Sequence, residues 1–368
     1  MKATLAIDAR WLVGGIGTYT RHLLEGLWKH GNGFEVHAIT RRGHAEAVRP
    51  WCSRVTVVDV PIYTMREQWA MPQAAKGCDL LHVPHYNAPL LSRGPVVASI
   101  LDLIHITDEG YRGGIRSWLY ARPMLNLVAR KAAHIVTISE YSKAQIVDRL
   151  GVTAGRVTVI HCGVGEEFQA ADRREALNAV RAELGIEQPY VLYLGSLKPH
   201  KNVSCLLRAF AILQQRQDLP HELLIIGEGA RWKSSLVQES VRLGIAGKTK
   251  FVPYVRPGLL PKIYAAADLL VMPSRIEGFG LPILEAMACG TPVICSRAAS
   301  LPEVGGNAVV YFDPEDPEEL AEAVERVLGS SELQRDLRAK GMTRARQFTW
   351  EESTGKHVEL YQRLLGVN

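Results

Sequence analysis

The chain has 368 residues, of which 47% are hydrophobic and 22% are charged, and its mean hydropathy is close to zero. These values are those of a globular protein and predict no long disordered tail, and the length is too great for one ordinary core but suits two domains. The net charge is +5, and the excess lies in residues 1–170, which hold 19 Lys and Arg against 14 Asp and Glu. This excess predicts an acidic or membrane-bound partner for that half, although a charge of this size is also ordinary for a globular domain.

The cysteines and the apolar runs limit the kind of protein this is. The six cysteines are scattered, and no two have the Cys-x-x-Cys spacing of a zinc ribbon or a redox dithiol. Residues 1–10 contain an apolar run too short for a signal peptide, and no stretch reaches the ~18 apolar residues that a membrane span needs. We therefore expect a cytoplasmic protein with buried, reduced thiols.

The first half alternates short apolar runs with segments of helical length. The run at residues 3–8 leads into a glycine loop with Gly14, Gly15 and Gly17, and then into a helix expected from about Thr18 to Lys29. Further strands are expected at residues 35–39, 55–58, 80–83, 96–100, 135–138 and 157–160. Strands that alternate with helices predict a parallel sheet built from βα units.

A polar stretch at residues 166–174 lacks apolar periodicity and is interpreted as a linker, after which the alternation restarts. Strands are expected at residues 190–194, 223–226, 250–252, 269–272, 292–295 and 308–312. The sequence therefore predicts an α/β protein with two Rossmann-like, doubly wound domains, at residues 1–170 and 171–350. We expect the ligand between them, at the carboxyl ends of the strands.

The segment at residues 277–285 combines the features of a phosphate site and a sugar site. Glu277 precedes a glycine turn, Glu285 lies in the helix that follows, and Pro282 stands near the helix start, where its missing N–H is harmless. The helix start is positive and presents backbone amides, which suits a diphosphate. Each carboxylate accepts hydrogen bonds from two vicinal hydroxyls, so one suits a sugar and the other a ribose. Either glutamate alone would be a solvated acid at a helix end, but their spacing favours function. The residues expected at this helix start are Gly278, Phe279, Gly280 and Leu281.

Residues 273–292, PSRIEGFGLPILEAMACGTP, resemble the Glu-x7-Glu motif of the retaining glycosyltransferase family 4, whose fold is GT-B. The resemblance extends over most of the chain. It includes GGIGTYT at 14–20, PHYNAPL at 84–90, LDLIH at 101–105, ISEYSK at 138–143, GSLKPHKN at 195–202 and FTWEES at 348–353. PHYNAPL and GSLKPHKN are most similar to the mannosyltransferase branch that builds bacterial O-antigens and related polysaccharides. The resemblance also implies that the last helix, at about residues 351–368, packs back on the N-terminal domain.

The resemblance implies a role for each matching residue. Glu277 would hold the hydroxyls of the donor sugar, Glu285 the ribose, and Lys201 the donor diphosphate. Lys201 has independent support, because it follows the strand at 190–194 and precedes a helix, where a cation offsets charge on a leaving group. The alternative for Lys201 is an exposed loop lysine.

The glycine loop of Gly14, Gly15 and Gly17 corresponds to a loop that relatives bring against the donor phosphates and the reacting sugar. Glycine is needed where backbone approaches a ligand closely. Thr20 stands where a GxGxxG pattern would have its last glycine, which sets aside a nicotinamide or flavin dehydrogenase.

Two departures from the family pattern affect the reaction centre. Relatives commonly have a His-Asp pair where this chain has Leu101 and Asp102. His105 is a candidate replacement, and a surface or capping histidine is the alternative. Ser196 and His200 stand where many relatives have arginine, so His200 would add charge only when it is protonated.

Tyr254 and Val255 correspond to the region that holds the nucleotide base in the family. The backbone of Val255 would read the base edge, and a packed loop is the alternative. The catalytic candidates are thus Glu277, Lys201, Asp102 and His105.

The acceptor side is predicted from a stretch without acidic residues, between Glu109 and Glu140. Its basic and aromatic residues are Tyr111, Arg112, Arg116, Trp118, Tyr120, Arg122, Arg130 and Lys131. A helix with basic and aromatic residues of this kind suits a membrane surface or a lipid diphosphate. The stretch therefore predicts a polyprenyl-diphosphate-linked acceptor. It also predicts peripheral association, through residues 111–131, with the inner face of the cytoplasmic membrane. The alternative is a helix whose aromatic residues pack inward. Nucleic acid is a poorer hypothesis, because no binding motif is present.

The sequence as a whole predicts a retaining glycosyltransferase. It would transfer a hexose, with mannose from GDP-mannose as the best hypothesis, to a growing lipid-linked glycan. We expect no cofactor besides the nucleotide-sugar donor, and the lack of an Asp-x-Asp motif implies no divalent metal. The alternatives are a disaccharide phosphorylase, a nucleotide-sugar epimerase, and a non-catalytic partner subunit of the same fold.

Overall fold

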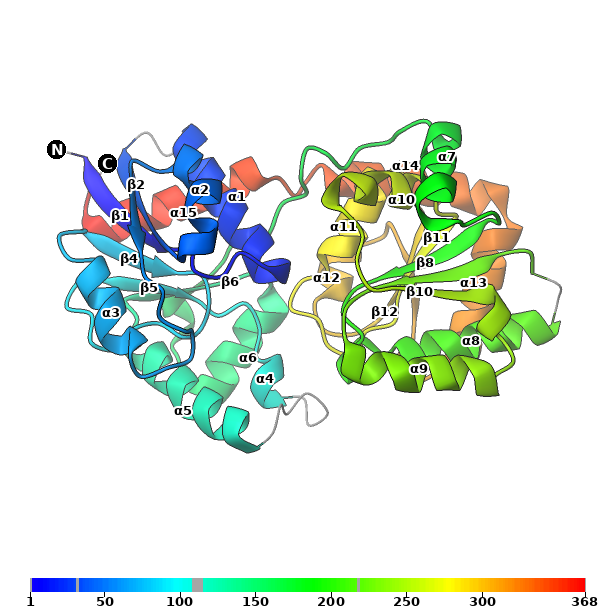
Figure 1. Cartoon of the computed structure of the whole chain (residues 1–368), viewed down its shortest axis with the longest axis horizontal. Coiled ribbons are helices and arrows are strands. Elements are labelled where there is room, and N and C mark those ends of the chain that lie inside the picture. Colours follow the sequence, from blue (N-terminus) through cyan, green and yellow to red (C-terminus); the bar gives the residue numbers. More distant parts are fainter. Residues whose placement is uncertain (1, 31–32, 108–114, 217–218, 368) are drawn as a thin grey trace. The chain divides into compact units, whose positions relative to one another are not determined.

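The chain forms two compact units in its computed structural model (Figure 1). Unit 1 comprises Met1–Gly163 and Thr349–Asn368, and unit 2 comprises Val164–Phe348. The structure describes residues 2–30, 33–107, 115–216 and 219–367, without the side chains of residues 105 and 115–120. The chain leaves unit 1 after Gly163, a few residues before the stretch that the sequence indicated as a linker.

Unit 1 contains a seven-stranded parallel sheet in the order β3-β2-β1-β4-β5-β6-β7. Its strands are β1 (Ala3–Asp8), β2 (Phe34–Thr40), β3 (Arg54–Val57), β4 (Leu80–Val83), β5 (Val96–Ser99), β6 (His134–Thr137) and β7 (Val157–Val159). Strand order reverses between β1 and β4, and in open α/β sheets ligands bind at the carboxyl ends beside that reversal.

The helices of unit 1 connect these strands as the alternating pattern predicts. They are α1 (Gly14–His30), α2 (Ala45–Val48), α3 (Glu67–Ala74), α4 (Ile104–Thr107), α5 (Ile115–Lys131), α6 (Glu140–Leu150) and α15 (Trp350–Leu365). The prediction that the first helix begins at about Thr18 is wrong, because α1 begins at Gly14 and includes the glycines in its first turn. Gly17 allows this early start, since a Cβ there would lie 2.2 Å from the carbonyl carbon of Leu12.

Helix α15 packs against α1 within unit 1, as Figure 1 shows. Gly26 on α1 makes the close approach possible, because a Cβ at Gly26 would lie 1.9 Å from Oγ1 of Thr354 on α15. The ring of His22 stacks on Trp350 at 4.4 Å between centroids. The last helix is therefore an integral part of the core of unit 1.

A buried hydrogen-bond network joins α15 to the sheet of unit 1. The Tyr19 hydroxyl lies 2.7 Å from Nε2 of His357 and 3.0 Å from Oγ of Ser99. His82 on β4 contacts Ser99 through Nε2 at 2.8 Å and the Tyr361 hydroxyl through Nδ1. All five side chains are at most 1% exposed, so each polar atom needs the partner it has.

Unit 2 contains a six-stranded parallel sheet in the order β10-β9-β8-β11-β12-β13. Its strands are β8 (Tyr190–Leu194), β9 (Glu222–Ile226), β10 (Thr249–Val252), β11 (Leu269–Met272), β12 (Val293–Ser296) and β13 (Val310–Phe312). Its helices are α7 (Arg173–Leu184), α8 (Val203–Arg216), α9 (Ala230–Arg242), α10 (Leu260–Ala266), α11 (Leu281–Ala288), α12 (Leu301–Gly305), α13 (Pro317–Gly329) and α14 (Ser331–Ala345). The order reverses between β8 and β11, which marks the ligand-binding edge of this unit.

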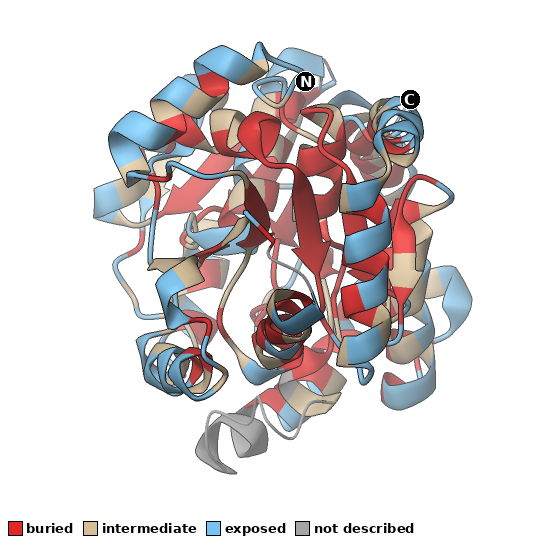
Figure 2. Cartoon of the chain, turned by 90° about the vertical axis from the view of Figure 1, so that its right-hand side faces the viewer, coloured by how far each residue is buried: buried red, intermediate tan, exposed pale blue. Residues whose placement is uncertain are grey.

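Burial explains why the strands read as continuous apolar runs. The residues of β11 and β12 are all buried, as expected for a parallel sheet that helices cover on both faces. In Figure 2 the central strands are red and the surrounding helices expose their pale blue outer faces. Both units thus have the doubly wound architecture that the sequence predicts.

Candidate functional site

The strongest candidate site lies at the strand-order reversal of unit 2. Lys201 follows β8 in a short 3₁₀ turn, and Glu277 follows β11 in the loop before α11. Nζ of Lys201 lies 2.5 Å from Oε1 of Glu277, and Glu277 is only 7% exposed. A buried carboxylate and a cation are therefore paired where a doubly wound sheet binds its ligand.

The loop that carries Glu277 is fixed by serine side chains. Ser300 Oγ donates to the carbonyl oxygens of Glu277 at 2.9 Å and Phe279 at 3.0 Å. Ser296 Oγ donates to the carbonyl oxygen of Ser274, whose own hydroxyl lies 3.3 Å from Glu277 Oε1. These buried hydroxyls hold the loop before any ligand binds, which is the preorganisation that a binding site needs.

The glycine turn before α11 requires glycine at one position. Gly280 has φ +108°, and a Cβ there would lie 2.8 Å from Cδ2 of Leu301. Leu281 and Pro282 then begin α11, as the sequence predicted for a helix start. Phe279 is 3% exposed and packs edge-on against Phe348, so its side chain belongs to the core and only its backbone is placed at the turn. Gly278 precedes it in the same loop.

Glu285 lies on α11 and is half-buried. Burial raises the pKa of Glu285 to about 7, and the Glu167 carboxylate adds to the rise, while a hydrogen bond from Tyr264 opposes it. That hydroxyl donates to Oε2 at 2.7 Å. Glu285 is thus held in one orientation, with an ionisation that changes near neutral pH.

The remaining predicted donor residues of unit 2 differ in exposure. His200 is 5% exposed, and its carbonyl oxygen accepts from the Arg275 amide at 2.8 Å, which ties the turn that presents Lys201 to the loop after β11. The Ser196 carbonyl oxygen accepts from the Tyr193 hydroxyl at 2.7 Å, which fixes the loop after β8. Tyr254 is 64% exposed and Val255 is buried, and both follow the edge strand β10.

In unit 1, the predicted glycines lie at the start of α1. Gly14 and Gly15 are exposed, and a Cβ at either would meet nothing within 4 Å. Gly17 is buried against Leu12, so its smallness serves packing, whereas the other two leave the loop surface open. Asp102 follows β5, and its Oδ1 accepts from the Ile104 amide at 3.1 Å. The side chain of His105 lies outside the described part of the structure.

A buried charged network lies at the carboxyl ends of β1 and β4 and was missed by sequence reasoning. Arg10 donates to both carboxylate oxygens of Asp8 at 2.9 and 2.8 Å, and to Oε2 of Glu67 at 2.9 Å. His85 Nε2 lies 3.4 Å from Asp8 Oδ2, and Asn87 donates to Glu67. All five are at most 2% exposed.

Asp8 is held in its ionised form within this network. Burial by itself raises the pKa of Asp8, but hydrogen bonds from His85 and Arg10 and the Arg10 charge outweigh burial and hold the pKa well below its ordinary value. The Asp8-x-Arg10 spacing at the end of the first strand and the PHYNAPL segment were the available signals. No sequence signal pointed to Glu67, because it lies at the start of α3, a helix that contains no recognisable motif.

The predicted membrane-facing stretch at residues 111–131 is described only in part. Residues 111–114 and the side chains of residues 115–120, including Arg116, Trp118 and Tyr120, lie outside the described structure. In the described half of α5, Arg122, Arg130 and Lys131 are exposed, and Leu127 is 48% exposed. No helix in the described parts of the chain is both long and apolar enough to cross a bilayer.

Comparison with known proteins decides the family. Residues 13–168 match the family model "Glycosyltransferase Family 4", and residues 178–344 match "Glycosyl transferases group 1". O-antigen chain mannosyltransferase B of Escherichia coli is 32% identical over 305 residues, which cover 82% of this chain and 78% of that protein. The chain belongs to glycosyltransferase family 4. The serotype-specific mannosyltransferase WbdA of E. coli is also similar to the glycosyltransferase, at 29% identity over 64% of this chain but only 29% of that longer protein.

Solved structures show that the fold of the glycosyltransferase is GT-B. Sucrose-phosphate synthase from Thermosynechococcus elongatus superposes with a TM-score of 0.79 at 23% identity, covering 99% of this chain and 100% of that one. HepE of Anabaena, solved with UDP and glucose, gives 0.80 at 19% identity, covering 98% and 100%. WaaG, a lipopolysaccharide glycosyltransferase, gives 0.77 at 18% identity, covering 97% and 99%.

Proposed function

We propose that this glycosyltransferase moves mannose from GDP-mannose, with retention of configuration, to a growing glycan on a polyprenyl-diphosphate lipid. The Lys201–Glu277 pair carries the proposal, since it puts a cation and a buried carboxylate side by side at the reversal of the unit 2 sheet, where doubly wound sheets bind ligands. The mannosyltransferases among its relatives support the choice of sugar and of glycan. The UDP-glucose complex of HepE makes a UDP-sugar the competing donor.

Each residue of the donor site has a defined part in this reaction. Glu277 accepts hydrogen bonds from hydroxyls of the donor sugar, and Glu285 accepts from the ribose. Lys201 exchanges its contact with Glu277 for the diphosphate and neutralises the charge that develops as the nucleotide leaves. Since Lys201 and Glu277 are already paired, the donor meets both groups in place.

The bond changes follow from retention by front-face attack. The bond between the anomeric carbon and the diphosphate oxygen breaks, and a bond from the acceptor hydroxyl oxygen forms on the same face. The acceptor proton passes to the leaving diphosphate oxygen, so no separate protein base is needed. Negative charge is therefore greatest at the diphosphate, where Lys201 would act.

A donor panel tests the proposal. GDP-mannose, GDP-fucose, UDP-glucose and UDP-galactose are each supplied with a polyprenyl-diphosphate-linked oligosaccharide, and the product is analysed for sugar, linkage and anomeric configuration. Wild type is compared with Glu277→Ala and with the matched control Glu332→Ala, an exposed glutamate in the first turn of α14. We expect transfer from GDP-mannose that Glu277→Ala abolishes and Glu332→Ala leaves unchanged.

The outcomes separate the proposal from its rivals. Transfer only from a UDP-sugar overturns the donor assignment, and full activity of Glu277→Ala overturns the site assignment. Phosphate-dependent cleavage of a disaccharide without nucleotide indicates a phosphorylase, and conversion of the donor without acceptor indicates an epimerase. Failure of every nucleotide sugar to bind or react refutes the central proposal.

A further inference from the structure

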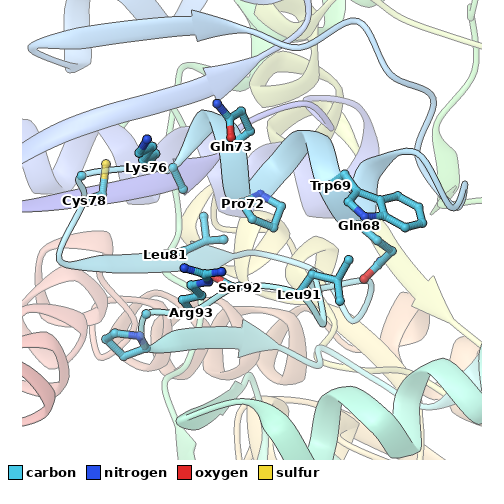
Figure 3. A pocket seen from close by; sticks show the side chains of 14 residues that line it. Gln68, Trp69, Pro72, Gln73, Lys76, Cys78, Leu81, Leu91, Ser92 and Arg93 are labelled. Carbon is cyan, nitrogen blue, oxygen red and sulfur yellow. The ribbon is translucent and has the colours of Figure 1, made fainter.

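A cavity lies in unit 1 beside α3, outside the residues assigned above to the donor. Its volume is about 550 Å³, within the range of small-molecule pockets. One side is formed by α3 and the turn that leads to β4, and the other by residues 91–95, which precede β5 (Figure 3). The cavity therefore extends along the length of one helix, within unit 1 alone.

One end of the cavity has an exposed aromatic surface. Trp69 is 61% exposed, and Leu91 nearby is 48% exposed. Figure 3 shows the Trp69 ring and Leu91 at the same end, with Pro72 next along the helix. An indole carries negative charge on its faces and so attracts the weakly positive C–H groups of a sugar ring. An indole in such a position suits a flat ligand with one apolar face.

A hydrogen-bond donor in the lining has no acceptor among the described residues. Gln68 is 3% exposed, and its Oε1 accepts from the Leu90 amide at 2.7 Å. Its Nε2, which is buried, has no hydrogen-bond partner among the described residues. Leaving a buried amide unsatisfied is unfavourable, so a lining donor of this kind marks a place for a ligand oxygen. Gln73 and Ser92 add further hydrogen-bonding groups to the lining.

The charge of the lining is positive. Lys76 and Arg93 line the cavity and are exposed, and neither forms an ion pair with a residue of the described ranges. No carboxylate from the described residues lines it. The neighbouring acids are engaged elsewhere, since Glu67 binds Arg10 and Asp79 accepts from the Thr4 amide. The cavity thus favours an anionic group.

We propose that this cavity binds a phosphorylated saccharide. The sugar ring stacks on Trp69, its hydroxyls bind the amides of Gln68 and Gln73, and its phosphate lies between Lys76 and Arg93. The proposal does not depend on the donor or the acceptor of the proposed reaction. The same chemistry is offered by a free sugar phosphate and by a phosphosugar within a glycan.

Calorimetric titration of the full chain tests the proposal with mannose 6-phosphate, mannose and inorganic phosphate. We expect one site for mannose 6-phosphate, with a Kd at least tenfold below those of mannose and of phosphate. Trp69→Ala and the double variant Lys76→Ala/Arg93→Ala should each raise this Kd at least tenfold. The matched controls are Trp28→Ala, at a tryptophan that is 55% exposed on α1, and Arg242→Ala, at an exposed arginine on α9, and both should bind as wild type does.

Other results overturn the proposal. Loss of binding in Lys201→Ala would place the ligand in the donor site. If inorganic phosphate alone binds as tightly as mannose 6-phosphate, the cavity does not recognise the sugar ring. The absence of binding, or binding that the cavity variants leave unchanged, would refute the site. Competition with a phosphorylated oligosaccharide distinguishes the two ligand sources. If the oligosaccharide binds at least tenfold more tightly than mannose 6-phosphate, the ligand is a segment of a glycan. If the two bind equally, the ligand is a free sugar phosphate.

Discussion

Acidification should release α15 from unit 1. The two buried histidines that bind it, His357 and His82, are neutral in the folded unit, and protonating them favours the open chain. Burial lowers the pKa of His357 to about 4, although the carbonyl oxygen of Ser353 opposes the shift. Burial also lowers the pKa of His82, and the neighbouring His357 and His85 lower it further. An unfolded histidine has a pKa of about 6.5, so between pH 6.5 and 4 the open chain binds protons that the folded unit excludes. The stability that these neutral histidines contribute to the packing of α15 is therefore fully present above about pH 6.5 and is lost as the pH falls toward 4.

The size of the effect follows from the shift of His357. A difference of about 2.5 pKa units corresponds to a loss of about 3 kcal/mol once the pH is below 4, and of about 2 kcal/mol at pH 5. A loss of about 2 kcal/mol raises the opening equilibrium of α15 roughly 30-fold. His82 adds to the effect with the same sign.

Hydrogen–deuterium exchange measures this opening helix by helix. Exchange of α15 peptides, corrected for the intrinsic pH dependence, should increase roughly 30-fold between pH 7 and pH 5, while peptides from β11 and β12 serve as an internal reference. His357→Gln should remove the share of the pH response that comes from His357 and leave the share from His82, whereas His30→Gln, at the exposed end of α1, should keep the whole response. Unchanged exchange of α15 at pH 5, or a full response in His357→Gln, would refute the reasoning.

Three further predictions concern the donor site and the packing of α15. Lys201→Met should lower kcat by about 10²–10³, as expected for loss of a group that stabilises leaving-group charge, and steady-state kinetics with an unchanged kcat would contradict the assigned role. Because the pKa of Glu285 is raised to about 7, its carboxylate becomes ionised between pH 6 and pH 8. Donor affinity measured by calorimetry should therefore increase over this range in wild type but not in Glu285→Gln. A flat wild-type profile would exclude ribose binding by the ionised carboxylate. Gly26→Val should destabilise unit 1 by about 1–3 kcal/mol in thermal unfolding, and Thr354→Ala should restore part of the loss; additive losses would show that the two side chains do not meet.

The fold was predictable because the information for it is local. Parallel strands covered on both faces are continuous apolar runs, and runs such as Leu269–Met272 are bounded by polar turns and helical segments. The start of α1 was misplaced because glycines usually interrupt helices. Here Gly14 takes a positive φ of +63° at the first position, and Gly17 packs on Leu12.

How much of the candidate site the sequence could predict depends on how much of the site lies within one segment. Glu277 and Glu285 share a short motif, and Lys201 was assigned from the resemblance of residues 195–202, with its place after a strand as independent support. Their contact spans 76 residues and arises from the adjacency of β8 and β11, which no local pattern specifies.

The buried networks of unit 1 escaped prediction for the same reason. His82 and Tyr19 lie in segments that read as ordinary strand and helix, and their partner His357 lies far along the chain. A buried polar residue differs from a surface one only through its partners, and those are set by tertiary structure.

The return of the chain from unit 2 to unit 1 has a consequence for synthesis on the ribosome. Because unit 1 is completed by α15, its sheet and α1 emerge first but lack their last helix until residues 349–367 have been translated. Unit 2, which is continuous from Val164 to Phe348, is fully translated before that point and is free to fold as a single uninterrupted stretch. The nascent protein therefore carries an unfinished first unit, in which the surface of α1 that packs on α15 has no partner, throughout the translation of the second unit.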